Sequence, residues 1–180
     1  YLKAAELRVE SLVSRLSTDK NYYNWWRADN DGEIPFFHAS DAGMPLLSLL
    51  RFIEVVPDSH LKVKIIETVK ASLKFELSVT AEVKNPFGYA RQYVKGLESG
   101  LRTSFFIPHD NWSGYWWQGE NARIASLSAA VSSACIYFDK DSDFVNKLNI
   151  YSQNQINWIL GLNPFDVCMV HGFGRNNPEY

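Results

Sequence analysis

Apolar residues recur in five stretches of the chain at the three- and four-residue spacing of an amphipathic helix. These stretches are 2–16 and, approximately, 41–56, 59–80, 119–138 and 143–160. Pro57 separates the second stretch from the third, and Gly161 follows the fifth, as a helix-terminating glycine commonly does. The pattern therefore predicts five helices, each with one buried face.

Three segments of weak periodicity separate or follow these helices, and all three are rich in aromatic residues. They cover about 21–40, 82–118 and 161–180, whereas the remaining connections are turns of a few residues. Long segments without regular structure are commonly functional. The alternation of long and short connections predicts an all-α fold of helical hairpins arranged in a ring, with the long loops on one face. An ordinary helical bundle is the alternative.

The composition fits one globular domain and narrows the classes of partner. Apolar residues make up 46% of the 180 residues and aromatic residues 14%, and the formal net charge is −2. No basic stripe is present, so a nucleic-acid partner is not expected. No apolar run approaches the roughly 20 residues that span a bilayer, so a membrane partner is not expected either. Cys135 and Cys168 lie far apart in the sequence and leave the redox compartment open.

The segment before the fourth helix offers a surface suited to a sugar. Tyr115, Trp116 and Trp117 stand side by side, and Glu120 follows at the helix start. Aromatic faces with a polar rim match a sugar ring, which has apolar C–H faces and hydroxyl groups at its edge. The alternative is that the two tryptophans anchor the helix in the core.

Other chemistries find little support in the sequence. The histidines lack metal-ligand spacing, and neither cysteine has a catalytic context, so we expect no metal and no cofactor. The run from Asp29 to Gly32 imitates part of a calcium loop, but Arg27 and His38 occupy positions that need oxygen ligands, which excludes an EF-hand. Carboxylates among aromatic residues remain, and glycoside hydrolysis uses a pair of them.

Three sequence segments resemble segments of glycoside hydrolase family 9. The late segment of that family has a "YILG-NP" phrase followed by "GFG-N-P", and the matching residues here are Trp158-Ile159-Leu160-Gly161, Asn163-Pro164, Gly172-Phe173-Gly174 and Asn177-Pro178. WWQGENARIASLSAAV is similar to the preceding aromatic and alanine-rich helix of the family. FFHASDAGMPLLSLL is similar to an earlier helix start, where an aromatic residue and an aspartate approach the substrate.

The resemblance implies an (α/α)6 toroid and an O-glycosyl hydrolase that cleaves β-linked glycans with inversion. The family's catalytic base lies in an N-terminal "DAGD" motif and its acid is a late glutamate, and neither motif is present here. Asp41-Ala42-Gly43 echoes the base motif but lacks its second aspartate and lies in the wrong part of the order. We therefore expect no catalytic residue in this segment.

The two ends of the sequence predict a piece of a longer chain, and the resemblance implies that this piece is the central to late segment of the catalytic domain. Tyr1 begins inside a helical pattern and Tyr180 stands in a loop pattern, so 1–180 is interpreted as a single partial catalytic domain with both ends truncated. The expected partners are a β-linked oligo- or polysaccharide and the remainder of the same catalytic domain. The family favours a secreted or periplasmic location and leaves a cytoplasmic one open.

The resemblance and the residues together predict a set of substrate-binding side chains. The set comprises His38, Asp41, Tyr115, Trp116, Trp117, Glu120, His171 and Arg175. Carboxylates near aromatic residues favour exo-action on glucosamine-containing oligosaccharides, because an amino sugar is a cation. The alternative within the family is an endoglucanase on β-1,4-glucan. Alternatives of another class are a non-catalytic carbohydrate-binding protein and a sugar epimerase or lyase toroid that uses His38, His109 and His171.

Overall fold

The computed structural model describes residues 1–29, 32–38, 40–106, 108–114, 119–140 and 142–178. These residues form helices α1 (Leu2–Val13), α2 (Met44–Val55), α3 (Lys62–Ala81), α4 (Glu120–Cys135) and α5 (Asp143–Ile159), and strands β1 (Leu16–Thr18), β2 (Tyr23–Trp26), β3 (Gln92–Lys95) and β4 (Leu101–Ser104). The five predicted helices are confirmed. α1 is shorter than predicted, because Leu16 leaves the helix and enters β1.

The prediction of an all-α fold, part of an (α/α)6 toroid, is wrong. Segment 82–118 contains an antiparallel hairpin of β3 and β4, and segment 21–40 contains β2, which pairs with β1 immediately before that segment. The described residues therefore form a mixed α and β fold with two small two-stranded sheets. The strands are only three or four residues long, which is too short to show the alternating pattern that identifies a strand in a sequence.

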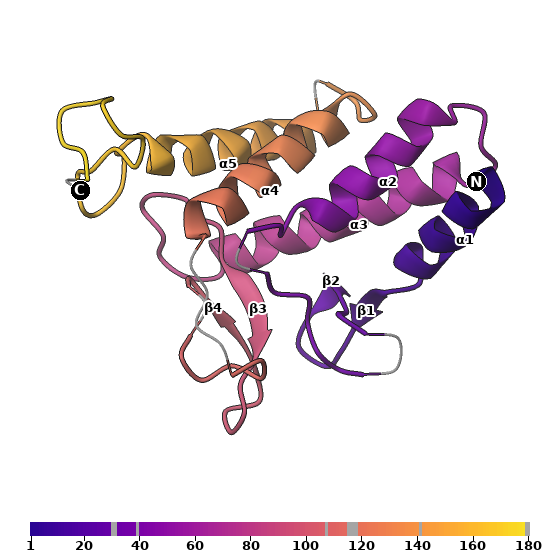
Figure 1. Cartoon of the computed structure of the whole chain (residues 1–180), viewed down its shortest axis with the longest axis horizontal. Coiled ribbons are helices and arrows are strands. Elements are labelled where there is room, and N and C mark those ends of the chain that lie inside the picture. The colour runs from indigo at the N-terminus through magenta and orange to yellow at the C-terminus, as the bar shows by residue number, and fades with distance from the viewer. Residues whose placement is uncertain (30–31, 39, 107, 115–118, 141, 179–180) are drawn as a thin grey trace.

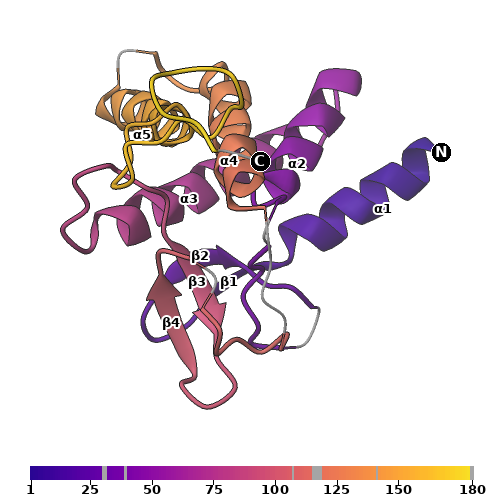
Figure 2. The ribbon, with the colours of Figure 1, turned by 60° about the vertical axis from the view of Figure 1, so that its left-hand side comes forward.

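The helices form one layer, and both hairpins lie on the same side of it. Figure 1 shows β1–β2 and β3–β4 below the helices, and the rotated view in Figure 2 keeps this arrangement. α4 and α5 pack along each other, and α2 contacts both α3 and α4. The main core lies between these helices and includes Leu49, Ile65 and Leu148. None of the helices in the described part of the chain is long and apolar enough to cross a membrane.

The two hairpins are joined to each other and to α3 by aromatic side chains. The Tyr22 and Tyr93 rings lie 4.7 Å apart, and Trp25 meets Tyr93 edge to face at 5.6 Å. The Tyr93 hydroxyl donates to Asp19 at 2.8 Å. Phe75 of α3 belongs to the same buried cluster. Tyr22, Trp25 and Tyr93 of the two hairpins therefore pack against one another and against α3.

α2 begins in direct contact with the middle of α4. The Gly43 N–H donates to the Ser126 hydroxyl at 3.0 Å, and a Cβ at Gly43 would lie 2.2 Å from the Ser126 carbonyl oxygen. That distance is far shorter than a van der Waals contact, so a larger residue at position 43 requires the backbones of α2 and α4 to separate. This close approach fixes residues 40–42 against α4.

We expect Gly43→Ala to reduce the free energy of unfolding by about 1–3 kcal/mol through overpacking. The backbone is not the cause, because Gly43 has φ −79, which alanine adopts readily. Urea unfolding followed by circular dichroism measures the loss. Ser48→Ala, in the same helix, is the control and should stay within about 0.5 kcal/mol of the parent. Equal midpoints for the two variants would contradict the close approach.

Candidate functional site

His38 and Asp41 form a polar turn immediately before α2. The His38 Nδ1 accepts the backbone N–H groups of Ser40 at 3.2 Å and Asp41 at 3.1 Å, so a neutral ring carries its proton on Nε2. The ring stacks on Phe36 with centroids 6.0 Å apart. The Asp41 carboxylate accepts the Ser40 hydroxyl at 3.1 Å. Both predicted residues are partly exposed, so both can meet a ligand from the surface.

Glu120 begins α4 and pairs with a buried cation. Its Oε1 accepts Arg123 Nε at 2.8 Å and Nη2 at 2.6 Å. Arg123 is 1% exposed and also donates to the Ala90 carbonyl at 2.7 Å. The structure thus gives Glu120 a structural partner, whereas its predicted contact with substrate stays a prediction. The spacing of three residues between Glu120 and Arg123 is visible in the sequence as a helical ion pair.

Glu76 of α3 is a second carboxylate near Arg123, and sequence reasoning missed it. Burial raises the pKa of Glu76 to about 7, although the charge of Arg123 and a hydrogen bond from the Tyr151 hydroxyl act in the opposite direction. That hydroxyl lies 3.4 Å from Glu76 Oε2. Glu76 follows Val69 by seven residues and Leu73 by three, so it falls on the buried stripe of α3. A carboxylate on an apolar stripe is the signal that could have identified it.

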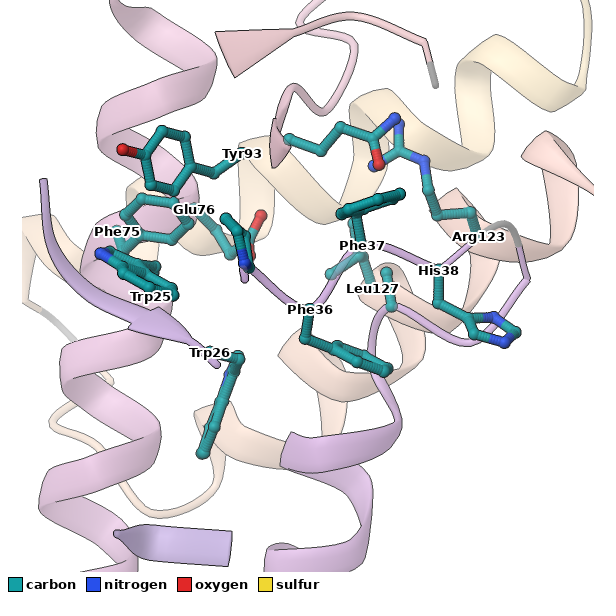
Figure 3. Close-up of a pocket in the computed structure, with 13 residues that line it drawn as sticks. Trp25, Trp26, Phe36, Phe37, His38, Phe75, Glu76, Tyr93, Arg123 and Leu127 are labelled. Atoms are coloured by element: carbon teal, nitrogen blue, oxygen red, sulfur yellow. The ribbon is translucent and has the colours of Figure 1, made fainter. Parts of the chain in front are cut away.

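Glu76 borders a small cavity beneath residues 35–38. The wall combines aromatic rings with polar groups, and Figure 3 shows Glu76 between the cluster of Trp25 and Tyr93 and the side occupied by Phe37 and Arg123. The cavity volume is about 30 Å³. This space holds a water molecule or two and is far too small for a sugar ring. The ring of His38 turns away from Glu76 in Figure 3.

The remaining predicted residues lie elsewhere. His171 and Arg175 are exposed in the segment after α5, beyond the helix end in Figure 1, and neither borders the cavity. Arg175 forms an exposed ion pair with Asp166. The structure therefore does not bring these two residues to His38. Tyr115, Trp116 and Trp117 lie outside the described residues.

Two further acidic residues of the long segments support loops. Asp29 accepts the Gly32 N–H at 2.7 Å. Asp110 accepts the Leu97 N–H at 2.8 Å, and hydrogen bonds from Ser99 and Leu97 lower the pKa of its carboxyl. Among the described residues no group of three potential metal ligands converges. These carboxylates therefore hold loop geometry.

The two thiols and the histidines show no reactive grouping in the described part of the chain. Cys135 and Cys168 are free thiols, and burial raises the pKa of Cys135. Of the three histidines considered for an epimerase or lyase, His38 borders the cavity, whereas His109 and His171 do not. A scan against models of known protein families finds no match, and a search of curated proteins finds no significantly similar sequence.

Proposed function

We propose that this chain is the substrate-binding segment of an inverting glycoside hydrolase that acts on β-linked glycans. The sequence phrases at 36–50, 116–131 and 158–178 support the choice of family. The observation that carries the proposal is the partly exposed turn of His38 and Asp41, which Gly43 holds against α4. In the sequence, the aromatic run 115–117 comes just before α4. The proposal concerns the site and does not depend on a toroid.

We assign no catalytic role to the carboxyl groups of Glu120 and Glu76. An inverting glycosidase needs an acid and a base about 6.5–9.5 Å apart with room for water between them. Glu120 is committed to Arg123, and Glu76 lies beside a cavity too small for a sugar. We therefore assign binding to this segment and place the acid and base in the remainder of the catalytic domain.

The favoured substrate is a glucosamine-containing oligosaccharide. The Asp41 carboxylate is partly exposed beside a histidine ring, and an ammonium group on a sugar would form a charge-assisted hydrogen bond with it. A β-1,4-glucan offers only neutral hydroxyl groups at that position. Selectivity for an amino sugar therefore depends on the charge of Asp41.

Calorimetric titration of the full chain with chitosan and cellulose oligosaccharides tests the assignment. We expect tighter binding of the chitosan oligosaccharide, and we expect Asp41→Asn to remove the preference without unfolding the chain. We expect no hydrolysis of either sugar by the chain alone. Absence of binding to both sugars would reject the proposed function, and an unchanged preference in Asp41→Asn would reject the role of Asp41.

A second test addresses the aromatic run. We expect Trp117→Ala to weaken oligosaccharide binding about fivefold or more, since stacking on a ring contributes on the order of 1 kcal/mol. Trp112→Ala is the matched control, because Trp112 is an exposed tryptophan of the same segment. The affinity of the control should stay near the parent value. An unchanged affinity in Trp117→Ala would favour the core-anchor interpretation.

A further inference from the structure

Two residues that border the cavity beneath residues 35–38 carry buried side-chain polar atoms that lack hydrogen-bond partners among the described residues. These atoms are both side-chain amide atoms of Gln92 and the indole Nε1 of Trp26. Gln92 is 8% exposed and Trp26 6% exposed, so bulk water does not reach these side chains freely. A buried polar group without a partner costs about 1–3 kcal/mol, so native proteins rarely leave three such atoms around one space.

Trp25 also borders the cavity, but its indole has another role. Burial raises the pKa of Asp19, but hydrogen bonds outweigh it and lower the pKa, and one of these hydrogen bonds comes from Trp25. The inference therefore rests on Gln92, Trp26 and the two charged groups that face the cavity, Glu76 and Arg123.

The mixture of donors and acceptors defines the class of ligand. Gln92 presents a donor and an acceptor, Trp26 presents a donor, and Glu76 presents a carboxyl group. A cation would meet the guanidinium of Arg123 and two N–H donors, and an anion would meet Glu76. Water is neutral, donates two hydrogen bonds and accepts two, so one or two water molecules can serve these donors and acceptors together.

We infer that this cavity is a binding site for one or two water molecules, which hydrogen-bond to Gln92 and Trp26 and hydrate the carboxyl group of Glu76. The volume of about 30 Å³ matches this occupancy. Residues 35–38 cover the site, and the segment is held by a hydrogen bond from the Phe36 N–H to the Trp26 carbonyl at 2.6 Å. The inference is independent of the proposed function.

Gln92→Met tests the inference through the sign of the change in Tm. Methionine has nearly the shape of glutamine without its polar atoms. In a hydrated cavity the substitution removes partners from the bound water, and we expect Tm to fall by roughly 2–4 °C. In a dry cavity it removes two unpaired polar atoms, so Tm would rise, and a rise would overturn the inference. Gln153→Met on the exposed face of α5 is the control, with no expected change.

A measurement on the unmodified chain covers the case in which Gln92→Met does not fold. We expect a nuclear Overhauser cross-peak between bound water and the indole N–H proton of Trp26. The backbone amide of Leu73, which is buried inside α3, should give none. Absence of the Trp26 cross-peak would overturn the inference.

Discussion

Replacement of Arg123 by methionine is expected to lower the free energy of unfolding by about 3–5 kcal/mol. Arg123 is almost completely buried and pairs with Glu120, and its charge also acts on Glu76. Methionine keeps much of the side-chain volume but removes the charge and the hydrogen bond to the Ala90 carbonyl. The carboxyl groups of Glu120 and Glu76 then lose the nearby positive charge, and the Ala90 carbonyl loses its hydrogen-bond donor. Urea unfolding at pH 7 measures the loss.

Arg51→Met is the matched control for this substitution. Arg51 of α2 forms an ion pair with Glu54 at 2.7 Å, but the side chains are 69% and 62% exposed. Exposed pairs contribute at most about 1 kcal/mol. We therefore expect a small loss for Arg51→Met and a large one for Arg123→Met. Losses of equal size would show that burial of the Arg123 charge does not govern its contribution.

The second large effect is a dependence of stability on pH that arises from Glu76. The pKa of this carboxyl is raised from 4.5 to about 7 in the folded chain. The folded state therefore holds the Glu76 proton more tightly than the unfolded state. The resulting stabilisation is fully present below pH 4.5 and is lost as pH rises through 7. The shift corresponds to roughly 3 kcal/mol.

Glu76→Gln should remove this dependence, because glutamine is neutral at every pH. We expect the variant to gain stability relative to the parent chain as pH increases from 5 to 8, in unfolding experiments at each pH. Glu67→Gln is the control, since Glu67 is exposed on the same helix, and its difference from the parent should not depend on pH in this way. Parallel curves for Glu76→Gln and the parent would contradict the buried state of this carboxyl.

Asp19 and Glu82, like Asp110, act on the pH dependence of stability in the opposite direction and do not obscure the comparison. For Asp19 and Glu82, burial alone would raise the pKa, but hydrogen bonds outweigh it and the pKa of each is lowered. Their stabilisation is lost as pH falls toward their lowered pKa values. All three groups remain in Glu76→Gln, so their contribution cancels when the variant is compared with the parent.

The helices could be predicted from sequence, whereas the hairpins could not. A helix such as α3 repeats its apolar spacing over several turns, from Ile65 to Val79, so the period is unmistakable. β2 has four residues, and its buried pair of Trp25 and Trp26 is consecutive instead of alternating. Trp25 is buried against residues of α3 and β3, and Trp26 is buried in the main core, so both depend on residues that are far away in the sequence. Local patterns do not contain that information.

Part of the candidate site could also be predicted from sequence, namely the residues that local patterns identify. His38 and Asp41 stand at a helix start, where polar side chains commonly reach the surface, and the structure places them there. The involvement of Glu76 with Arg123 depends on how α3 and α4 pack, which no short motif encodes. His171 and Arg175 were assigned from a loop phrase, and the fold keeps that loop away from the cavity.

The contacts between the two hairpins affect the order in which parts of the chain fold and unfold. A two-stranded hairpin is marginal by itself in water, so β1–β2 and β3–β4 need each other and α3 to persist. The Tyr93 hydroxyl and Asp19 are 74 residues apart, so their contact forms only after α3 and the intervening chain have come together. Amide protons of both hairpins should therefore exchange with solvent as one cooperative unit, earlier than those in the centre of α3. The side of the helix layer that carries the two hairpins would then be the last part to assemble and the first to open.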